Sequence, residues 1–397
     1  MTDMFELTAK TTAGARLVRI AEAHAEEFAS RAALHDREAS FPHAAVDALK
    51  RARYFYAPIP AENGGLGVSS VHDVVVASSR LARGDASIAI GANMHLVLLL
   101  NIVRRWQAAA AAGDRRRATA FAASMNAIAR DGVVMASAVS EHGQDLTRPQ
   151  TTATRTPSGW RIEGRKAFCT MSPAATVLST AVTFAGDDGI ERYGYAQVPA
   201  DAAGVEIQND WDALGMRASG SHSVTFTDVA VERSALRGGF VAGDSDAYME
   251  RNLLAGLFHA SASLGIAEGA AAAATDSAAR RGEPDARTRM LIAENVIDLG
   301  ACRATLSRSA TLVDESDGDV VPLFAETQAA KAFVNESAAR IVDRALAISG
   351  GAGYLNGHPL ARAYRDVRAG SFMHPLGANR AYDLVGDVAL GRHHALR

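Results

Sequence analysis

A change in the spacing of apolar residues divides this chain of 397 residues into three parts. Through roughly the first third, apolar residues recur at helical spacing, for example at Leu17, Ile20 and Phe28. The middle consists of short segments rich in β-branched and aromatic residues, and helical spacing resumes near Tyr248. Helices, then strands, then helices predict an α+β fold in which a β-domain lies between two helical blocks.

Turn-forming sequences such as Pro157-Ser158-Gly159 set the bounds of these segments. We expect an N-terminal helical domain at residues 1–132, a central antiparallel β-domain at 133–237 and a C-terminal helical bundle at 238–397. The long C-terminal helices are expected at roughly 250–279, 287–314 and 323–348. The strands are expected at 133–139, 151–156, 160–164, 175–184, 193–198 and 221–226.

Charge and composition exclude several classes of partner. The formal net charge of −3 gives no indication of a nucleic-acid or membrane partner. Cys169 and Cys302, the two cysteines, exclude a disulfide scaffold and fit a reducing cytoplasm. The N-terminus lacks the pattern of a signal peptide, and apolar runs such as Leu96–Leu100 are too short to span a bilayer. No metal-ligand spacing is present, and His393-His394 is interpreted as a terminal surface pair. We therefore expect a cytoplasmic protein without a metal.

A glycine-rich run, Ser349-Gly350-Gly351-Ala352-Gly353, follows a predicted helix. Because it does not follow a strand, it is not the dinucleotide-binding fingerprint of a Rossmann fold. It permits two interpretations: a helix C-cap with glycines in left-handed positions, or a close backbone approach to a flavin pyrophosphate.

Further elements that occur in order along the chain favour the flavin interpretation. They are Phe41-Pro42, the loop at Pro58–Gly67, Leu81–Ser87, Ser140-Glu141, Gly164-Arg165-Lys166, Leu214–Ser221 and the C-terminal stretch Asn335–Asp366. Taken together, these elements resemble the acyl-CoA dehydrogenase superfamily, flavoenzymes that desaturate acyl thioesters. The resemblance implies an N-terminal helical domain, a β-domain and a C-terminal four-helix bundle, assembled as a homodimer or homotetramer. It also implies FAD between the β-domain and the helices, held in part by a neighbouring subunit.

The residue that acts as base in this superfamily is replaced here. A typical member has a glutamate followed by Gly-Thr where this chain has His374-Pro375-Leu376. A minority of members supply the base from an earlier helix, and Glu250 falls on that position, followed by Arg251. By this resemblance, Glu250 removes the α-proton of an acyl-CoA or acyl-carrier-protein substrate, and an electron-transfer flavoprotein accepts the electrons. Arg251 and Met373 are expected to contact the substrate.

The resemblance also assigns residues to the flavin. Phe168 replaces the tryptophan that lies against the flavin ring and could cover it, while Thr170 and Ser172 could bond the ring edge. Ser140 begins the segment where the family reads Thr-Glu-Pro. The glycines Gly350, Gly351 and Gly353 are expected at the pyrophosphate.

Two other functions remain open at this point. One is a monooxygenase of the two-component branch, which receives reduced flavin, FMN or a diffusible flavin included, from a separate reductase and acts on a small metabolite. Such an enzyme does not need the glutamate, and His95, Thr170 and His374 would be its polar set. The other is a non-catalytic relative kept for binding or assembly, against which the retained Arg217, glycines and Arg365-Asp366 argue.

Overall fold

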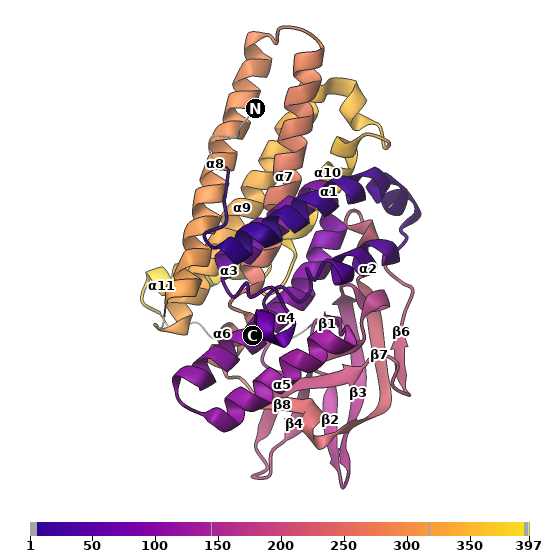
Figure 1. Ribbon diagram of the computed structural model, residues 1–397, viewed down its shortest axis with the longest axis vertical. Helices are drawn as coiled ribbons and strands as arrows, with labels where there is room; N and C mark the ends of the chain where they lie inside the picture. The colour runs from indigo at the N-terminus through magenta and orange to yellow at the C-terminus, as the bar shows by residue number, and fades with distance from the viewer. Residues whose placement is uncertain (1–5, 144, 317, 393–395, 397) are drawn as a thin grey trace.

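The computed structural model describes residues 6–143, 145–316, 318–392 and 396. The expectations for residues 1–5 of the N-terminus and for His393-His394 therefore lie outside the described residues. Figure 1 shows three levels: long C-terminal helices at one end, the sheet at the other, and the N-terminal helices across their junction.

The N-terminal block contains helices α1 (Thr12–Glu38), α2 (His43–Arg51), α3 (Val71–Gly84), α4 (Ala86–Ala111) and α5 (Arg115–Asp131). Asp85 ends α3 and begins α4, because its carboxylate accepts from the amides of Ser87 (2.8 Å) and Ile88 (3.3 Å). Such a side-chain cap satisfies amides that have no partner within the helix. The short polar Asp85 therefore turns one run of helical periodicity into two helices.

The middle of the chain forms one sheet of eight strands with the order β6-β7-β3-β2-β4-β5-β8, and β1 pairs with β4. The strands are β1 (Met135–Ala138), β2 (Thr152–Thr156), β3 (Gly159–Cys169), β4 (Val177–Ala185), β5 (Glu191–Pro199), β6 (Val205–Ile207), β7 (His222–Glu232) and β8 (Leu236–Val241). β1 and β2 run parallel to β4, and the other pairs are antiparallel. The sheet is therefore mixed rather than antiparallel as expected.

Two strands escaped the sequence analysis. β6 is short. β8 contains Gly238 and Gly239, both with positive φ, and glycine is depleted in strands. β8 continues to Val241, so the expected domain boundary at residue 237 falls inside this strand.

The C-terminal block contains α6 (Ser245–Asn252), α7 (Ala255–Arg280), α8 (Ala286–Glu315), α9 (Val320–Ser349), α10 (Pro359–Val367) and α11 (Ala378–Ala389). The helix expected at 250–279 is in fact two helices. Asn252 ends α6, where its side-chain amide donates to the carbonyl of Tyr248 (2.9 Å), a local bond that competes with the helical one.

An ion cluster lies where α3, α7 and α8 meet. Glu268 of α7 accepts from Arg83 (2.8 Å) and Arg303 (2.8 Å), and the guanidinium of Arg80 lies 3.5 Å away. Burial raises the pKa of Glu268, but the charges and hydrogen bonds of the arginines outweigh it, so the pKa is lowered overall. The cluster thus ties together three helices by charges that water does not screen.

Two helical segments, Ala86–Ala111 and Ser245–Arg280, are long and apolar enough to cross a membrane by length and composition. The sequence analysis considered only shorter apolar runs and did not single them out. In the folded chain 83% and 94% of their most apolar stretches are buried. This burial is what the core helices of a folded domain show, so their apolarity is accounted for by packing.

Candidate functional site

A cavity of about 490 Å³ lies between the sheet and the two helical blocks. Its walls come from β1, the end of β3, the loop before β7, α4, α7 and the segment 365–374. Five residues expected at the site line it together: Ser140, Phe168, Thr170, Met373 and His374. This size is ordinary for a site that binds a cofactor or a small molecule. We call it the central cavity.

Phe168 reaches the central cavity because β3 is irregular there. The pairing of β3 with β7 shifts register between Lys166 and Cys169, and Phe168 has a φ of 55°. A bulge of this kind redirects a side chain out of the sheet. Phe168 is 59% exposed, and its ring meets that of Trp211 edge to face, with centroids 6.0 Å apart. An exposed aromatic face of this kind can cover a flat ring system.

Polar groups lie at the edges of this aromatic wall. The hydroxyls of Thr170 and Ser221 form a hydrogen bond of 2.9 Å. Ser140 forms an isolated β-bridge with Ala167. Both ring nitrogens of the buried His259 lack a hydrogen-bond partner among the described residues. Because buried polar groups are rarely left unpaired, they indicate a bound partner. A largely apolar cavity with an aromatic wall and polar edges fits a flavin ring.

His374 is held in one orientation and one tautomer. Its Nε2 lies 2.9 Å from Oδ1 of Asn252, whose amide nitrogen donates to Tyr248. Oδ1 is therefore the acceptor, Nε2 carries the proton, and Nδ1 keeps a free lone pair. Burial lowers the pKa of His374 to about 3, and the charges of Lys331, Arg251 and Arg380 contribute. His374 is therefore neutral at neutral pH.

Lys331 of α9 anchors the segment that carries His374. Its ammonium group donates to the backbone carbonyls of Met373 and Leu376, the latter at 2.7 Å. Burial lowers the pKa of Lys331 to about 7. The same segment is fixed from α6, where the hydroxyl of Tyr248 donates to the carbonyl of Pro375 at 3.2 Å. Pro375 has no backbone N–H to donate, but its carbonyl accepts the hydrogen bond from Tyr248.

The structure does not bring Glu250 to the central cavity. Glu250 is exposed and lines a separate surface pocket with Arg104, Leu254 and Asp314. On α6 it is Tyr248 and Met249 that are buried, so Glu250 faces away from the protein interior. Arg251, its neighbour, instead faces a pocket that adjoins the central cavity. This placement argues against Glu250 as the base and separates it from His374.

His95 has a structural environment. It is fully buried, Nε2 bonds the carbonyl of Phe55 (3.1 Å), and Nδ1 accepts from the amide of Met135 (3.0 Å). Burial lowers its pKa to about 4. With both nitrogens occupied by backbone groups, His95 links α4 to β1 and does not line the central cavity. This geometry argues against a catalytic role.

The remaining expected residues lie outside the lining of the central cavity. Ser172 is buried, and its hydroxyl donates to the carbonyl of Gly220 at 3.1 Å. Gly350 and Gly351 are exposed, with no atom within 4 Å of a Cβ built at either position, whereas Gly353 packs against Ser349. Whether these glycines approach a flavin from a neighbouring subunit stays a prediction.

Sequence reasoning missed His259, Trp211 and Ser137, which also line the central cavity. His259 lies in an apolar stretch of α7, and a histidine in such a stretch is the one signal that could have drawn attention to it. Trp211 lies in a loop between strands, where nothing in the sequence indicates which way its ring points.

A helical block, a β-domain and a second helical block around such a cavity define a flavin-dependent oxidoreductase of the acyl-CoA dehydrogenase fold. Sequence profiles support this class along the chain: those of the acyl-CoA dehydrogenase N-terminal, middle and C-terminal domains match residues 17–112, 135–229 and 257–374. The chain belongs to the acyl-CoA dehydrogenase family, and its cofactor is a flavin.

Among its relatives the chain is similar to amino sugar nitrososynthases. It is 36% identical to amino sugar nitrososynthase RubN8 of Streptomyces rubradiris, over 97% of this chain and 92% of the relative. It is 34% identical to L-evernosamine nitrososynthase of a Micromonospora species, over 96% of this chain and 91% of the relative. The structure of KijD3 in complex with FMN and dTDP-3-amino-2,3,6-trideoxy-4-keto-3-methyl-D-glucose has a TM-score of 0.89 and 32% identity, covering 98% of this chain and 97% of KijD3.

Replacing Phe168 by alanine is expected to weaken flavin binding. The change removes the aromatic face from the central cavity, and loss of an aromatic contact of this kind corresponds to roughly a 10-fold higher Kd. Titration of oxidised flavin, followed by its fluorescence, measures the effect. Ile190→Ala, at an exposed apolar side chain on the turn between β4 and β5, serves as control and should bind flavin as the wild type does. Equal affinities of the two variants would contradict a flavin against Phe168.

Proposed function

We propose that the protein is a reduced-flavin-dependent N-oxygenase that converts the primary amine of a nucleotide-linked amino sugar to a hydroxylamine and then to a nitroso group. Similarity to nitrososynthases over nearly the whole chain supports this reaction. The amino sugar bound with FMN in the KijD3 structure supports the substrate class. A separate flavin reductase is the partner that this reaction requires.

The observation that carries the proposal is the chemistry of the central cavity. No aspartate or glutamate is among the described residues that line it, and His374, at the position of the family's glutamate, is neutral. Dehydrogenation of a thioester needs a base within reach of the α-proton, whereas oxygenation of an amine needs a nitrogen with a free lone pair. Among the described residues the cavity thus lacks the carboxylate that serves as base in the first reaction.

The surroundings of His374 favour a neutral amine. Burial and the charges of Lys331, Arg251 and Arg380 disfavour a proton on His374, and they disfavour a proton on a substrate amine at the same place. A carboxylate there would do the opposite, because an opposite charge stabilises an ammonium ion. Nδ1 of His374 is the acceptor to which the amine N–H can donate. The amine is therefore oriented in the form that reacts with an electrophilic oxygen.

When bound, reduced flavin would supply the two electrons needed to reduce each molecular oxygen, so that one oxygen atom goes to the substrate and the other leaves as water. The first oxidation would convert R–NH₂ to R–NHOH, with one hydrogen left on nitrogen. The second would use another O₂ and another reduced flavin to add a second hydroxyl to nitrogen, and loss of water would then give R–N=O. His259, with two unpaired ring nitrogens, can donate to one substrate oxygen and accept from another. The apolar side chains of Met94, Phe168 and Met373 offer water no hydrogen bonds at this place.

Acyl-thioester dehydrogenation, the leading hypothesis of the sequence analysis, rested on Glu250 as the base. Glu250 is exposed and lines another pocket, so the structure gives no support to that step. The electron-transfer flavoprotein expected as partner belongs to that hypothesis and is replaced here by the reductase.

The test supplies the protein with FMN or FAD, a flavin reductase, NADH and oxygen, together with a dTDP-linked 3-amino sugar. We expect a product that gains oxygen from isotopically labelled O₂, detected by mass spectrometry, and no product when the reductase is left out. A panel of acyl-CoA thioesters, added to the oxidised flavoprotein without oxygen, should leave the flavin absorbance unchanged. Bleaching by a thioester, with no oxygenated sugar, would overturn the proposal in favour of dehydrogenation.

A further inference from the structure

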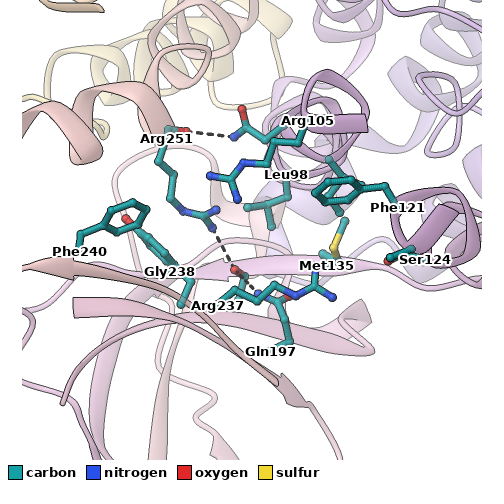
Figure 2. A pocket seen from close by; sticks show the side chains of 15 residues that line it. Leu98, Arg105, Phe121, Ser124, Met135, Gln197, Arg237, Gly238, Phe240 and Arg251 are labelled. Carbon is teal, nitrogen blue, oxygen red and sulfur yellow. Dashed lines mark hydrogen bonds between the residues drawn. The ribbon is translucent and has the colours of Figure 1, made fainter. Parts of the chain in front are cut away.

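A second pocket, of about 250 Å³, adjoins the central cavity between α4, α5, α6 and the strands β5 and β8. Three arginines line it, each from a different part of the chain: Arg105 on α4, Arg237 on β8 and Arg251 on α6. Figure 2 shows their side chains extending toward the same space, with Phe121 and Phe240 on the walls. We call it the arginine pocket.

The charges of the arginine pocket are not balanced within the described residues. None of its three arginines forms an ion pair with a described carboxylate, whereas the buried Arg80 and Arg303 do so. Glu250 and Asp314 line a neighbouring pocket that Arg105 and Arg251 also border, but neither pairs with them. Unpaired positive charges gathered in one pocket repel one another.

Arg251 shows this repulsion most clearly. Burial lowers its pKa, and the charges of Arg105 and Arg237 lower it further. Its guanidinium lies 3.6 Å from the centroid of the Tyr195 ring, and it donates to the hydroxyl of Ser179 at 3.2 Å. These contacts hold the side chain in place without neutralising it. Unneutralised guanidinium groups gathered around one space are suited to a bound anion, and phosphate oxygens match their geometry.

The arginine pocket and the central cavity lie next to each other, and both border on β1. Met135 lines the arginine pocket and Ser137 lines the central cavity. Because they are two residues apart on one strand, their side chains share a face and their Cα atoms lie about 6.6 Å apart. On α6, Arg251 precedes Asn252, which holds His374. The two cavities therefore lie side by side along β1, within the reach of one elongated ligand.

We infer that the arginine pocket binds the diphosphate of the sugar nucleotide, so that Arg105, Arg237 and Arg251 hold the phosphates while the sugar extends along β1 toward His374. This inference rests on the proposed function, because a sugar nucleotide has an anionic diphosphate next to its sugar. The same arginines could bind another phosphate, that of the flavin itself, and the experiment separates the two sources.

The experiment measures binding to the protein loaded with oxidised flavin, by calorimetry, with dTDP, thymidine and inorganic pyrophosphate as probes. We expect dTDP and pyrophosphate to bind, and thymidine to bind at least about 10-fold more weakly than dTDP. Arg105→Gln and Arg237→Gln should each raise the Kd of dTDP by roughly 10- to 100-fold. Both side chains are exposed, so these variants should fold. Arg116→Gln, at an exposed arginine of α5 outside the pocket, is the matched control and should leave the Kd unchanged.

Two results would overturn the inference. One is dTDP binding that is equal in the wild type and in both arginine variants. The other is release of flavin by pyrophosphate, with weakened flavin binding in the variants, which would assign the pocket to the flavin phosphate. The assay contains neither reductase nor amino sugar. A protein that binds dTDP through these arginines but oxidises no amine would therefore contradict the proposed function alone.

Discussion

Replacing His374 by glutamate is expected to lower kcat for amine oxidation by roughly 10- to 1000-fold at neutral pH. The introduced carboxylate would lie where the amine binds and raise the pKa of that amine by about one to three units. Protonation removes the lone pair that accepts oxygen. In this variant kcat should rise about 10-fold per pH unit until the amine is deprotonated, while KM falls because the ammonium ion binds the carboxylate. Steady-state kinetics from pH 6 to pH 9 would measure both effects.

The matched control for this change is His374→Gln, which keeps a neutral polar side chain and should lose less than about 10-fold in kcat. His374 itself should contribute no inflection to the wild-type profile between pH 6 and pH 9, because its pKa lies at about 3. Glu250→Gln should retain full activity, since Glu250 lies in another pocket. If the glutamate and glutamine variants had the same activity and the same pH profile, His374 would not govern the protonation of the amine.

Replacing Glu268 by glutamine is expected to lower the free energy of unfolding by about 3–5 kcal/mol. Glu268 is 5% exposed and accepts from Arg83 and Arg303, each at 2.8 Å, so the change leaves buried guanidinium charges without a counter-charge. Thermal or denaturant unfolding of the flavin-free protein measures the loss. The difference from the wild type should shrink as the pH falls below the ordinary glutamate pKa. The pKa of Glu268 is lowered in the fold, so its stabilisation is present above that pH and is lost as the carboxylate protonates.

An exposed ion pair provides the comparison for Glu268. Arg155 and Asp187 pair on the sheet, with side chains 42% and 82% exposed. Asp187→Asn should change the free energy of unfolding by less than about 1 kcal/mol, because solvent screens such pairs. Similar losses in the two variants would mean that burial does not strengthen the cluster around Glu268.

Much of the fold could be predicted from the sequence because its signals are local. Helical spacing placed α8 and α9 to within a few residues but joined the end of α6 to α7, and β-branched segments placed six of the eight strands. The missed β8 carries Gly238 and Gly239, which lack the side chains that mark a strand. The parallel pairing of β1 with β4 also escaped prediction, since strand direction depends on contacts between segments distant in the sequence.

The sequence by itself determined the family, the order of helices and strands, and the presence of histidine where relatives have glutamate. Tertiary structure alone decided which polar residues meet. The packing of α6 directs Glu250 to the surface and Arg251 inward. These residues are adjacent in the sequence, and which of them faces inward depends on the elements that pack against α6. Because α4 packs against β1, both ring nitrogens of His95 form hydrogen bonds with backbone groups. The arginine pocket joins α4, β8 and α6, and no local pattern encodes such a meeting, because it depends on how these distant elements pack together.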